Sequence, residues 1–195
     1  MSVRQYAFLI ALSVLLIVLV IMFFECGEEK KLVSEPVAQI LDSEEISGEE
    51  PETKMVSLFF LAERDDLLHS EVREIKAEAV LILQAKLVIR ELIKGSSNGG
   101  ISPIPVKTKL RELFITDDGI AFVDFSKEIQ DNQFYGSAGE IAVVFSIVNT
   151  LAYNFKSIKK VFILIDGREK ETLGGHIDLK RPLLPRFDLV VNLPR

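Results

Sequence analysis

Few side chains in this chain of 195 residues could do chemistry, and they are spread along its length. His69 and His176 are the only histidines. Ser126 could serve as a hydrolase nucleophile and His176 as its base, with Asp124 or Asp166 to orient the imidazole. However, no nucleophile elbow and no recognisable spacing links these residues. We therefore predict no catalytic residues and expect Ser126, which follows an apolar run, to be a cap or turn residue.

A metal site has equally little support in the sequence. Cys26 is the only cysteine, so neither an intrachain disulfide nor a cysteine-based zinc site can form. The two histidines lie on different segments, and a site would need both to meet a carboxylate such as Asp178. We predict no metal and no cofactor, and we expect His176 to be a hydrogen-bonded loop residue.

Two other polar groups stand out against apolar surroundings. Gly174 and Gly175 precede His176, and paired glycines let a backbone approach a ligand closely, although they also suit any tight turn. Asn149 and Thr150 lie inside an apolar helical pattern, where such side chains compete with the helix unless they have a specific partner. We expect that partner to lie within the domain, and we predict that Asn149 holds the loop 174–178.

The elements that must position these residues follow from periodicity and turn residues. Apolar runs predict strands at 55–61 and 161–165 and a shorter, partly exposed strand at 67–75. Helical spacing covers 77–94 and ends at Gly95, followed by a loop over 95–105. The runs 110–116 and 120–125 flank Asp117, Asp118 and Gly119, which indicates a hairpin with a tight turn.

A second helix is predicted to open at Ser137. Ser137 and Glu140 have the spacing of a capping box, and an apolar face extends from Ile141 to Phe155. The order strand, helix, hairpin, helix, strand predicts an α/β (α+β) domain in which two helices pack on one face of a small mixed sheet.

The amino-terminal part of the chain predicts a membrane anchor. After a short tail at 1–5, residues 6–24 are apolar apart from Ser13, which matches the ~20 residues that cross a bilayer. The bulky residues at its end do not suit signal-peptide cleavage, so Tyr6–Phe24 is predicted to stay attached as a single span. Lipidation of Cys26 stays open, although Glu25 stands where processing requires a small residue.

Charge separates the rest of the chain into a linker and a domain. Residues 27–54 hold nine acids and three lysines, and the whole segment 25–54 is predicted to be a flexible acidic linker. The predicted globular domain, 55–195, holds nineteen acids and nineteen bases. A nucleic-acid-binding domain normally carries a basic excess, and the lysines at 156, 159 and 160 form only a short cluster. We predict no nucleic-acid partner.

The domain carries an ordered set of motif residues: Ile104, Pro105, Thr108, Leu110, Asp118, Gly119, Ala121, Val123, Asp124, Phe125, Ser126, Asn149, Thr150, Leu151, Val161, Asp166, Gly167, Gly174, Gly175, His176, Ile177 and Asp178. In this order they resemble the GerMN domain of sporulation and germination proteins. The resemblance implies an envelope protein tethered outside the cytoplasm, a fold like the ring-building motifs of sporulation channels, and no established enzymatic activity. There are two departures: the sporulation protein has two such domains where this chain has room for one, which concerns ring assembly, and Lys107 stands where the family often has glycine, which concerns the geometry of that turn.

These observations leave three functional hypotheses for a single-pass protein of the bacterial cytoplasmic membrane whose domain faces outward. The first is a non-catalytic module that binds an envelope protein or copies of itself, which an exposed sheet edge or apolar patch would support. The second is a sensor for a small cell-wall fragment, bound in a pocket near loops 95–105 and 174–178. A cell-wall hydrolase is the remote third. Candidate binding-loop residues are Ser126, Asn149, Thr150, Gly167, Gly174, Gly175, His176 and Asp178.

Overall fold

The computed structural model describes residues 52–62, 64–131 and 136–193, which belong to a compact unit spanning Glu49–Arg195. The predicted tail at 1–5, the anchor Tyr6–Phe24, Cys26 and nearly all of the linker 25–54 lie outside the described residues. Among the helices that are described, none combines the length and hydropathy that a membrane crossing requires.

The first sheet is built on a long antiparallel pair. β1 (Thr53–Leu61) pairs with β2 (Leu68–Lys76) over its whole length, and β7 (Val190–Val191) runs parallel to the start of β2. β1 begins two residues before the predicted strand. β2 is as long as β1, not shorter as predicted, because its exposed residues alternate with buried ones that still face the core.

The second sheet confirms the predicted hairpin. β3 and β4 pair antiparallel, and β5 lies parallel to β4 on its other side. Gly119 has a φ of 85°, and a Cβ there would lie 2.5 Å from the Ser157 carbonyl oxygen, so only glycine fits this turn. The strand order is β3 (Leu110–Ile115), β4 (Ile120–Phe125), β5 (Lys160–Ile165) and β6 (Arg168–Glu169).

Two α-helices connect the described strands. α2 (Leu81–Lys94) ends at Gly95 as predicted, but it begins four residues later than predicted. The Ala77 N–H donates to the Glu52 carbonyl, which extends the strand pairing instead. α3 (Ser137–Asn154) begins at the predicted residue, and it is buried around most of its circumference.

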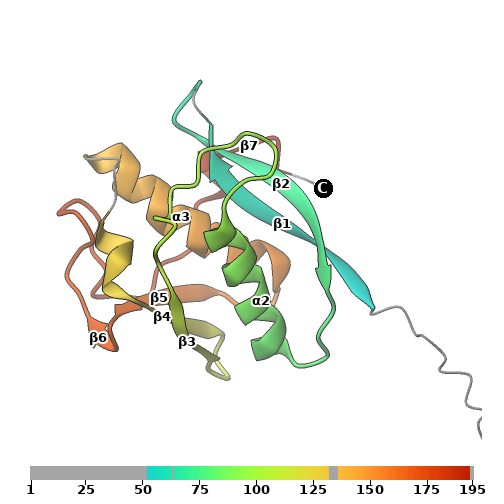
Figure 1. Cartoon of the computed structure of the whole chain (residues 1–195). Coiled ribbons are helices and arrows are strands. Elements are labelled where there is room, and N and C mark those ends of the chain that lie inside the picture. The colour runs from blue at the N-terminus through green and yellow to red at the C-terminus, as the bar shows by residue number, and fades with distance from the viewer. Residues whose placement is uncertain (1–51, 63, 132–135, 194–195) are drawn as a thin grey trace, which may run out of the picture. The chain divides into compact units, whose positions relative to one another are not determined.

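The architecture corrects the prediction of a single sheet with helices on one face. The described strands form two separate sheets, and each helix contacts both of them. α2 lies between the β1–β2 pair and β3, and α3 packs against β1 and β5 (Figure 1). The chain can therefore bury apolar side chains on both sides of the helices, which explains why α3 lacks a solvated polar stripe. The fold is mixed α+β.

Candidate functional site

The predicted capping box at the start of α3 does not form, because Glu140 has other partners. The N-cap residue is Gly136, whose carbonyl accepts the Glu140 N–H at 3.2 Å, and Glu140 is almost fully buried at 3 % exposure. The Glu140 carboxylate instead accepts backbone N–H groups from Leu173 (2.9 Å) and His176 (2.7 Å). A local capping contact has thus been replaced by a long-range contact that fixes the loop after β6.

The surroundings of Glu140 keep it ionised. Burial acts to raise the pKa of this carboxyl, but the backbone N–H groups of Gly174, His176, Leu173 and Ile177 outweigh burial and lower the pKa below 4.5. Gly174 fits closely, because a Cβ there would lie 3.4 Å from Oε2 of Glu140. The Glu140 carboxylate therefore holds the predicted loop of Gly174, Gly175 and His176, whereas the sequence predicted it in a helix capping box.

The contacts described within this loop serve to order the turn. His176 is held through its backbone N–H, and its side chain is exposed. The Gly175 N–H donates to Thr172 Oγ1 at 3.0 Å, and Asp178 Oδ1 accepts the Lys180 N–H, also at 3.0 Å. These contacts are those of an ordered turn, which was the preferred interpretation of the glycine pair.

Asn149 does not hold this loop, and that prediction was wrong. Its amide accepts the Arg186 N–H (2.8 Å) and donates to the Arg186 carbonyl (2.9 Å), so it fixes the segment that leads to β7. The expectation that the polar residues within α3 have partners inside the domain is nevertheless confirmed. The amide of Asn149 thus satisfies both backbone groups of Arg186 with its separate donor and acceptor atoms.

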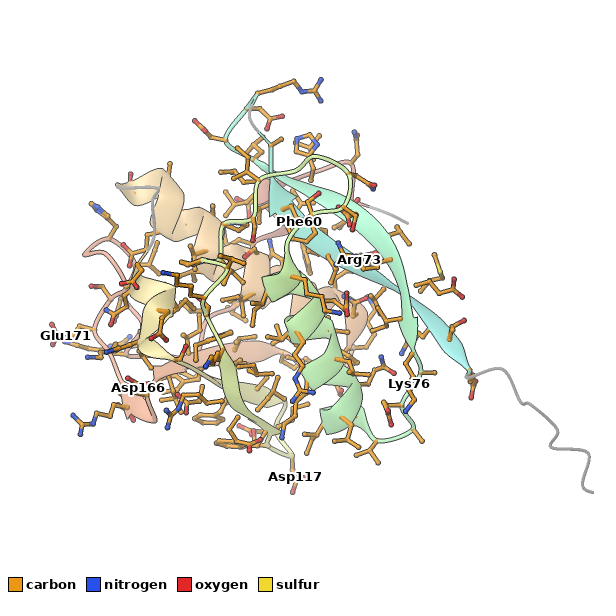
Figure 2. The ribbon with its side chains drawn as sticks, viewed as in Figure 1. Phe60, Arg73, Lys76, Asp117, Asp166 and Glu171 are labelled. Carbon is orange, nitrogen blue, oxygen red and sulfur yellow. The ribbon has the colours of Figure 1, made fainter. Side chains whose placement is uncertain are left out.

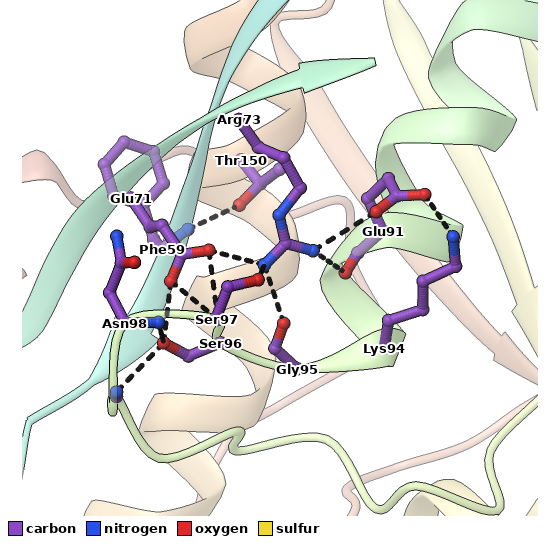
Figure 3. Close-up of polar contacts among 11 residues, drawn as sticks. Phe59, Glu71, Arg73, Glu91, Lys94, Gly95, Ser96, Ser97, Asn98 and Thr150 are labelled. Carbon is purple, nitrogen blue, oxygen red and sulfur yellow. Dashed lines mark hydrogen bonds and ion pairs between the residues drawn. The ribbon is translucent and has the colours of Figure 1, made fainter. Parts of the chain in front are cut away.

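Thr150 and Asn154 bind the outer edge of β1. Thr150 Oγ1 accepts the Phe59 N–H at 3.3 Å. The Asn154 side chain accepts the Ser57 N–H at 2.9 Å and donates to the Ser57 carbonyl at 2.7 Å. One helix thus supplies the hydrogen bonds that a neighbouring strand would make along this edge. Figure 3 shows the contact between Phe59 and Thr150.

Ser126 has the turn role that we expected. It stands at the start of a short 3-10 helix, Lys127–Gln130, and its Oγ accepts the Lys109 N–H at 2.9 Å. No hydrogen bond joins Ser126 to His176 among the described residues. The contact that would have supported a hydrolase is therefore not made in this part of the chain.

Gly167 belongs to a polar group at the end of β5. The Gly167 N–H donates to Oδ1 of Asp124 at 2.8 Å, and Arg111 Nε donates to the other oxygen at 2.9 Å. Arg111 also contacts Asp166 at 3.3 Å. Gly167 has a φ of 72° and forms the β5–β6 turn together with Asp166. The group connects β3, β4 and the end of β5. Both Asp124 carboxylate oxygens accept hydrogen bonds in this network.

The histidines do not combine into a metal site. His69 Nε2 lies 2.9 Å from Asp65, whereas His176 belongs to the loop that Glu140 holds. Within the described ranges, no three His, Cys, Asp or Glu side chains converge as a metal would require.

A hollow of about 390 Å³ lies beside the loop that follows α2. The sequence predicted a pocket near both loops 95–105 and 174–178, but this hollow is lined by residues of the first loop and by none of the second. Figure 2 shows Phe60, at this hollow, well apart from Asp166 at the β5–β6 turn. The lining residues are Phe60, Leu61, Ala62, Arg64, His69, Ser70, Glu71, Ser96, Asn98, Gly99 and Gly100.

Glu71 and Arg73 of β2 fix the loop beside this hollow (Figure 3). The buried Glu71 carboxylate accepts Ser96 Oγ at 2.6 Å and the Ser97 N–H at 3.1 Å. Burial acts to raise the pKa of Glu71, but Ser96, Arg73 and the Ser97 N–H together lower it. Arg73 donates to the Gly95 carbonyl at 2.8 Å, at the carboxyl end of α2. The polar atoms around Glu71 are thus used to hold the loop.

The outer face of the second sheet carries a row of three phenylalanines, one on each of three adjacent strands. Phe114 stacks on Phe122 with ring centroids 4.6 Å apart, and Phe122 lies 5.3 Å from Phe162. Their neighbours along β4, Ala121 and Val123, are fully buried and face the helices. Because side chains alternate along a strand, this aromatic row faces away from the core.

The exposure of the aromatic row decreases from its edge inward. Phe114 is 45 % exposed, whereas Phe162 is 5 % exposed. The row was not identified from the sequence. Alternation along 120–125 could have indicated it, but a strand's inward and outward faces are fixed only when the opposite face packs.

The comparisons with known proteins agree with this geometry. The model of the Germane family, described as sporulation and spore germination, matches residues 57–171, more than half of the chain. The chain belongs to this Germane (GerMN) family. No curated protein matches the chain.

Two solved structures of GerMN domains show the same fold. The first GerMN domain of the sporulation protein GerM from Bacillus subtilis is 25% identical, with a TM-score of 0.53, over 69% of this chain and 99% of that one. The tandem GerMN domains of GerM are 24% identical with a TM-score of 0.53, over 70% of this chain and 48% of that one. A candidate lipoprotein from Clostridium perfringens is 30% identical with a TM-score of 0.48, over 72% of this chain and 95% of that one.

The Germane family assignment also clarifies the departure at Lys107. The Thr108 N–H donates to the Pro105 carbonyl at 2.9 Å, so the turn closes with lysine at its third position. Lys107 does not have a positive φ. In this Germane domain, glycine is therefore not required for the turn, because the backbone conformation suits any residue with a side chain.

Proposed function

We propose that this Germane domain is a non-catalytic interaction module of the bacterial cell envelope. We further propose that Tyr6–Phe24 anchors it in the cytoplasmic membrane and that the domain lies outside the cytoplasm. Membership in a sporulation and germination family supports an envelope role. The apolar length of the anchor segment supports the attachment.

The observation that carries the binding role is the aromatic row on β3, β4 and β5. Aromatic side chains are enriched where proteins bind one another, because a rigid ring buries much apolar area and loses little side-chain entropy. Phe114 is 45 % exposed although it stacks on Phe122, so its outer part is available to a partner. Envelope proteins are the partners we propose for this face.

Photocrosslinking in the membrane tests this face. A photoreactive phenylalanine analogue is placed at Phe114 of the full chain, and at Val106 as a control that is apolar and 82 % exposed but off the sheet. We expect an adduct of defined mass at position 114 that an added Phe122→Ser substitution weakens. Equal adducts at both positions, or none at 114, would count against the proposal.

A second function is favoured by the hollow beside Ser96–Gly100. Its volume of about 390 Å³ would accept a small polar ligand such as a cell-wall fragment. Titration of the domain with a disaccharide-peptide from peptidoglycan tests this idea by NMR. Saturable shifts of the Gly99 and Gly100 amides, with Gly167 unmoved, would support binding. Unchanged spectra up to millimolar ligand would rule the idea out.

A further inference from the structure

The described strands have several edges, and most of them are protected. The outer edge of β1 is bonded by Thr150 and Asn154 of α3. β3 carries a register shift between Leu110 and Glu112, and such a bulge interferes with further pairing. β5 is covered on its open side by β6 and by a bridge between Val161 and Leu183.

The outer edge of β2 is different. β7 pairs only with Leu68 and His69, at the beginning of the strand. From Ser70 to Lys76, no backbone pairing covers this edge among the residues that the structure describes. The strand order of this sheet is β1, β2, β7, but β7 is so short that most of β2 has no described strand on its outer side. This open edge is about 20 Å long at the usual rise per residue, and its ladder with β1 has no register shift.

Contacts on one face of β2 also hold the open edge in place. Glu71 and Arg73 are both held by the loop after α2, and their side chains lie on the opposite face of the sheet from Val72. Val72 is 51 % exposed although it is apolar. An ordered strand loses little conformational entropy on pairing, which favours association.

The sequence of the edge is self-complementary in two registers. One is centred on Ile75, sets Glu74 opposite Lys76 and pairs only residues 74–76 of β2, and the other is centred on Val72 and is longer. When two β2 strands meet antiparallel with Val72 opposite Val72, Arg73 lies opposite Glu71 of the other copy. The same register places Glu74 opposite Ser70. Centring the pair on Glu71, Arg73 or Glu74 would instead place identical charges opposite each other, which is destabilising.

The Val72 register also fits the space that β7 leaves. The paired residues are 70–74 of each copy, and Leu68 and His69 remain with β7. Five residues a strand is a normal length for a ladder in globular proteins. The remaining residues of the edge, Ile75 and Lys76, would face the ends of the partner's β7.

We propose that two copies of this chain pair through the open edge of β2, antiparallel and centred on Val72. The proposal goes beyond the interaction role above, because it uses the edge of the first sheet and not the aromatic row of the second. It commits to a second copy as the partner, since residues 70–74 of the open edge can pair with themselves without placing identical charges opposite each other.

Disulfide trapping in the full, membrane-inserted chain tests both the edge and the register. Paired residues of antiparallel strands have Cα atoms about 4.5 to 5.5 Å apart, within the range that a disulfide spans. The background carries Cys26→Ser, which removes the only native thiol. We expect Val72→Cys to give mainly disulfide-linked dimers under mild oxidation.

Two further variants fix the register. Glu74→Cys alone should stay monomeric, whereas Glu74→Cys mixed with Ser70→Cys should give a mixed dimer. Met55→Cys, 61 % exposed on β1, is a matched control that should not crosslink. Crosslinking at Met55 equal to that at Val72 would indicate random collision and overturn the proposal. Monomeric Val72→Cys would overturn it as well.

Sedimentation of the full chain in nanodiscs gives a second measurement that does not need cysteine. Val72→Lys places two ammonium groups opposite each other and should shift dimers to monomers. The same variant should keep the photocrosslink at Phe114, because the two surfaces belong to different sheets. Dimers that persist in Val72→Lys would overturn the edge pairing. A wild-type chain that dimerises but gives no crosslink at Phe114 would overturn only the role of the aromatic row.

Discussion

The outer edges of β1 and β2 differ in whether their backbone N–H and C=O groups have hydrogen-bond partners. Along β1, three hydrogen bonds from Thr150 and Asn154 satisfy backbone groups of Phe59 and Ser57. Along the outer side of β2, only Leu68 and His69 have a described strand neighbour. Both strands have nine residues and share one ladder, so the difference comes from what packs beside them.

The comparison shows that a helix can end a sheet as effectively as a bulge or a charge. The polar side chains on α3 have a cost, because Thr and Asn are weak helix formers. That cost is offset because buried backbone groups left without partners would be more unfavourable. β2 has no such helix beside it, and its edge remains available for pairing.

The largest effect is expected when the Asn154 side chain is removed. Asn154→Ala leaves the N–H and the carbonyl of Ser57 without their partners, and Ser57 is 7 % exposed. We expect the free energy of unfolding to fall by about 3 kcal/mol. Urea denaturation of residues 49–195 measures it. Asn98→Ala, on an exposed loop, is the control, and a loss no larger than that of the control would show that α3 does not protect β1.

A smaller loss is expected for the contact that α3 makes at its other end. Glu140→Gln keeps the shape but removes the charge that accepts backbone N–H groups from Leu173 and His176. We expect a loss of about 2 kcal/mol at neutral pH, measured by the same denaturation.

The pH dependence separates this charge effect from packing. Because the folded state lowers the pKa of Glu140 below 4.5, its stabilisation is present above that value and is lost as pH falls through the folded pKa. Wild type should therefore lose stability between neutral pH and pH ~3 more steeply than Glu140→Gln. The slope that remains in the variant comes from Glu71 and from the exposed carboxyls whose pKa is also lowered, Asp65, Glu112, Glu128 and Asp188. Identical slopes would contradict the role of the carboxylate.

Thr150→Val sharpens the comparison at a single hydrogen bond. Valine keeps the branched shape of threonine and removes only the acceptor of the Phe59 N–H. We expect the free energy of unfolding to fall by about 1 kcal/mol, and Thr150→Ser to restore most of it. If valine and serine behave alike, the cost comes from packing and not from the hydrogen bond.

The smallest effect on stability is expected at the open edge. Val72→Lys changes a half-exposed residue with no partner strand on its outer side, so the unfolding free energy of the monomer should change by less than about 0.5 kcal/mol. Denaturation at a protein concentration that keeps the chain monomeric measures this. A large loss would mean that Val72 packs within its own chain.

Much of the fold follows from local sequence patterns. Gly95 ends α2, Ser137 begins α3, and Asp117–Gly119 turns the β3–β4 hairpin, as predicted. These features depend on backbone conformation and on residues close in sequence. The number of sheets could not be obtained in this way, because pairing between distant strands leaves no local signal.

The candidate site was predicted less completely than the fold. The sequence identified Gly174, Gly175 and His176 as one loop and Asn149 as a residue with a partner. It assigned Glu140 to a local cap and Asn149 to the wrong loop. A carboxylate accepts hydrogen bonds from the N–H groups that surround it in the folded chain. A rule based on local spacing does not predict donors that are distant in sequence.

By itself, the sequence determined the family, the boundaries of most elements and the need for partners within α3. Hydrophobic period, turn glycines and ordered motifs specify these features over a few residues at a time. Only the tertiary structure decided that α3 completes the edge of β1, that Glu140 holds a distant loop and that β2 remains open. Those outcomes depend on which surfaces meet when the two sheets enclose the helices, and that packing joins residues about ninety positions apart, such as Phe59 and Thr150.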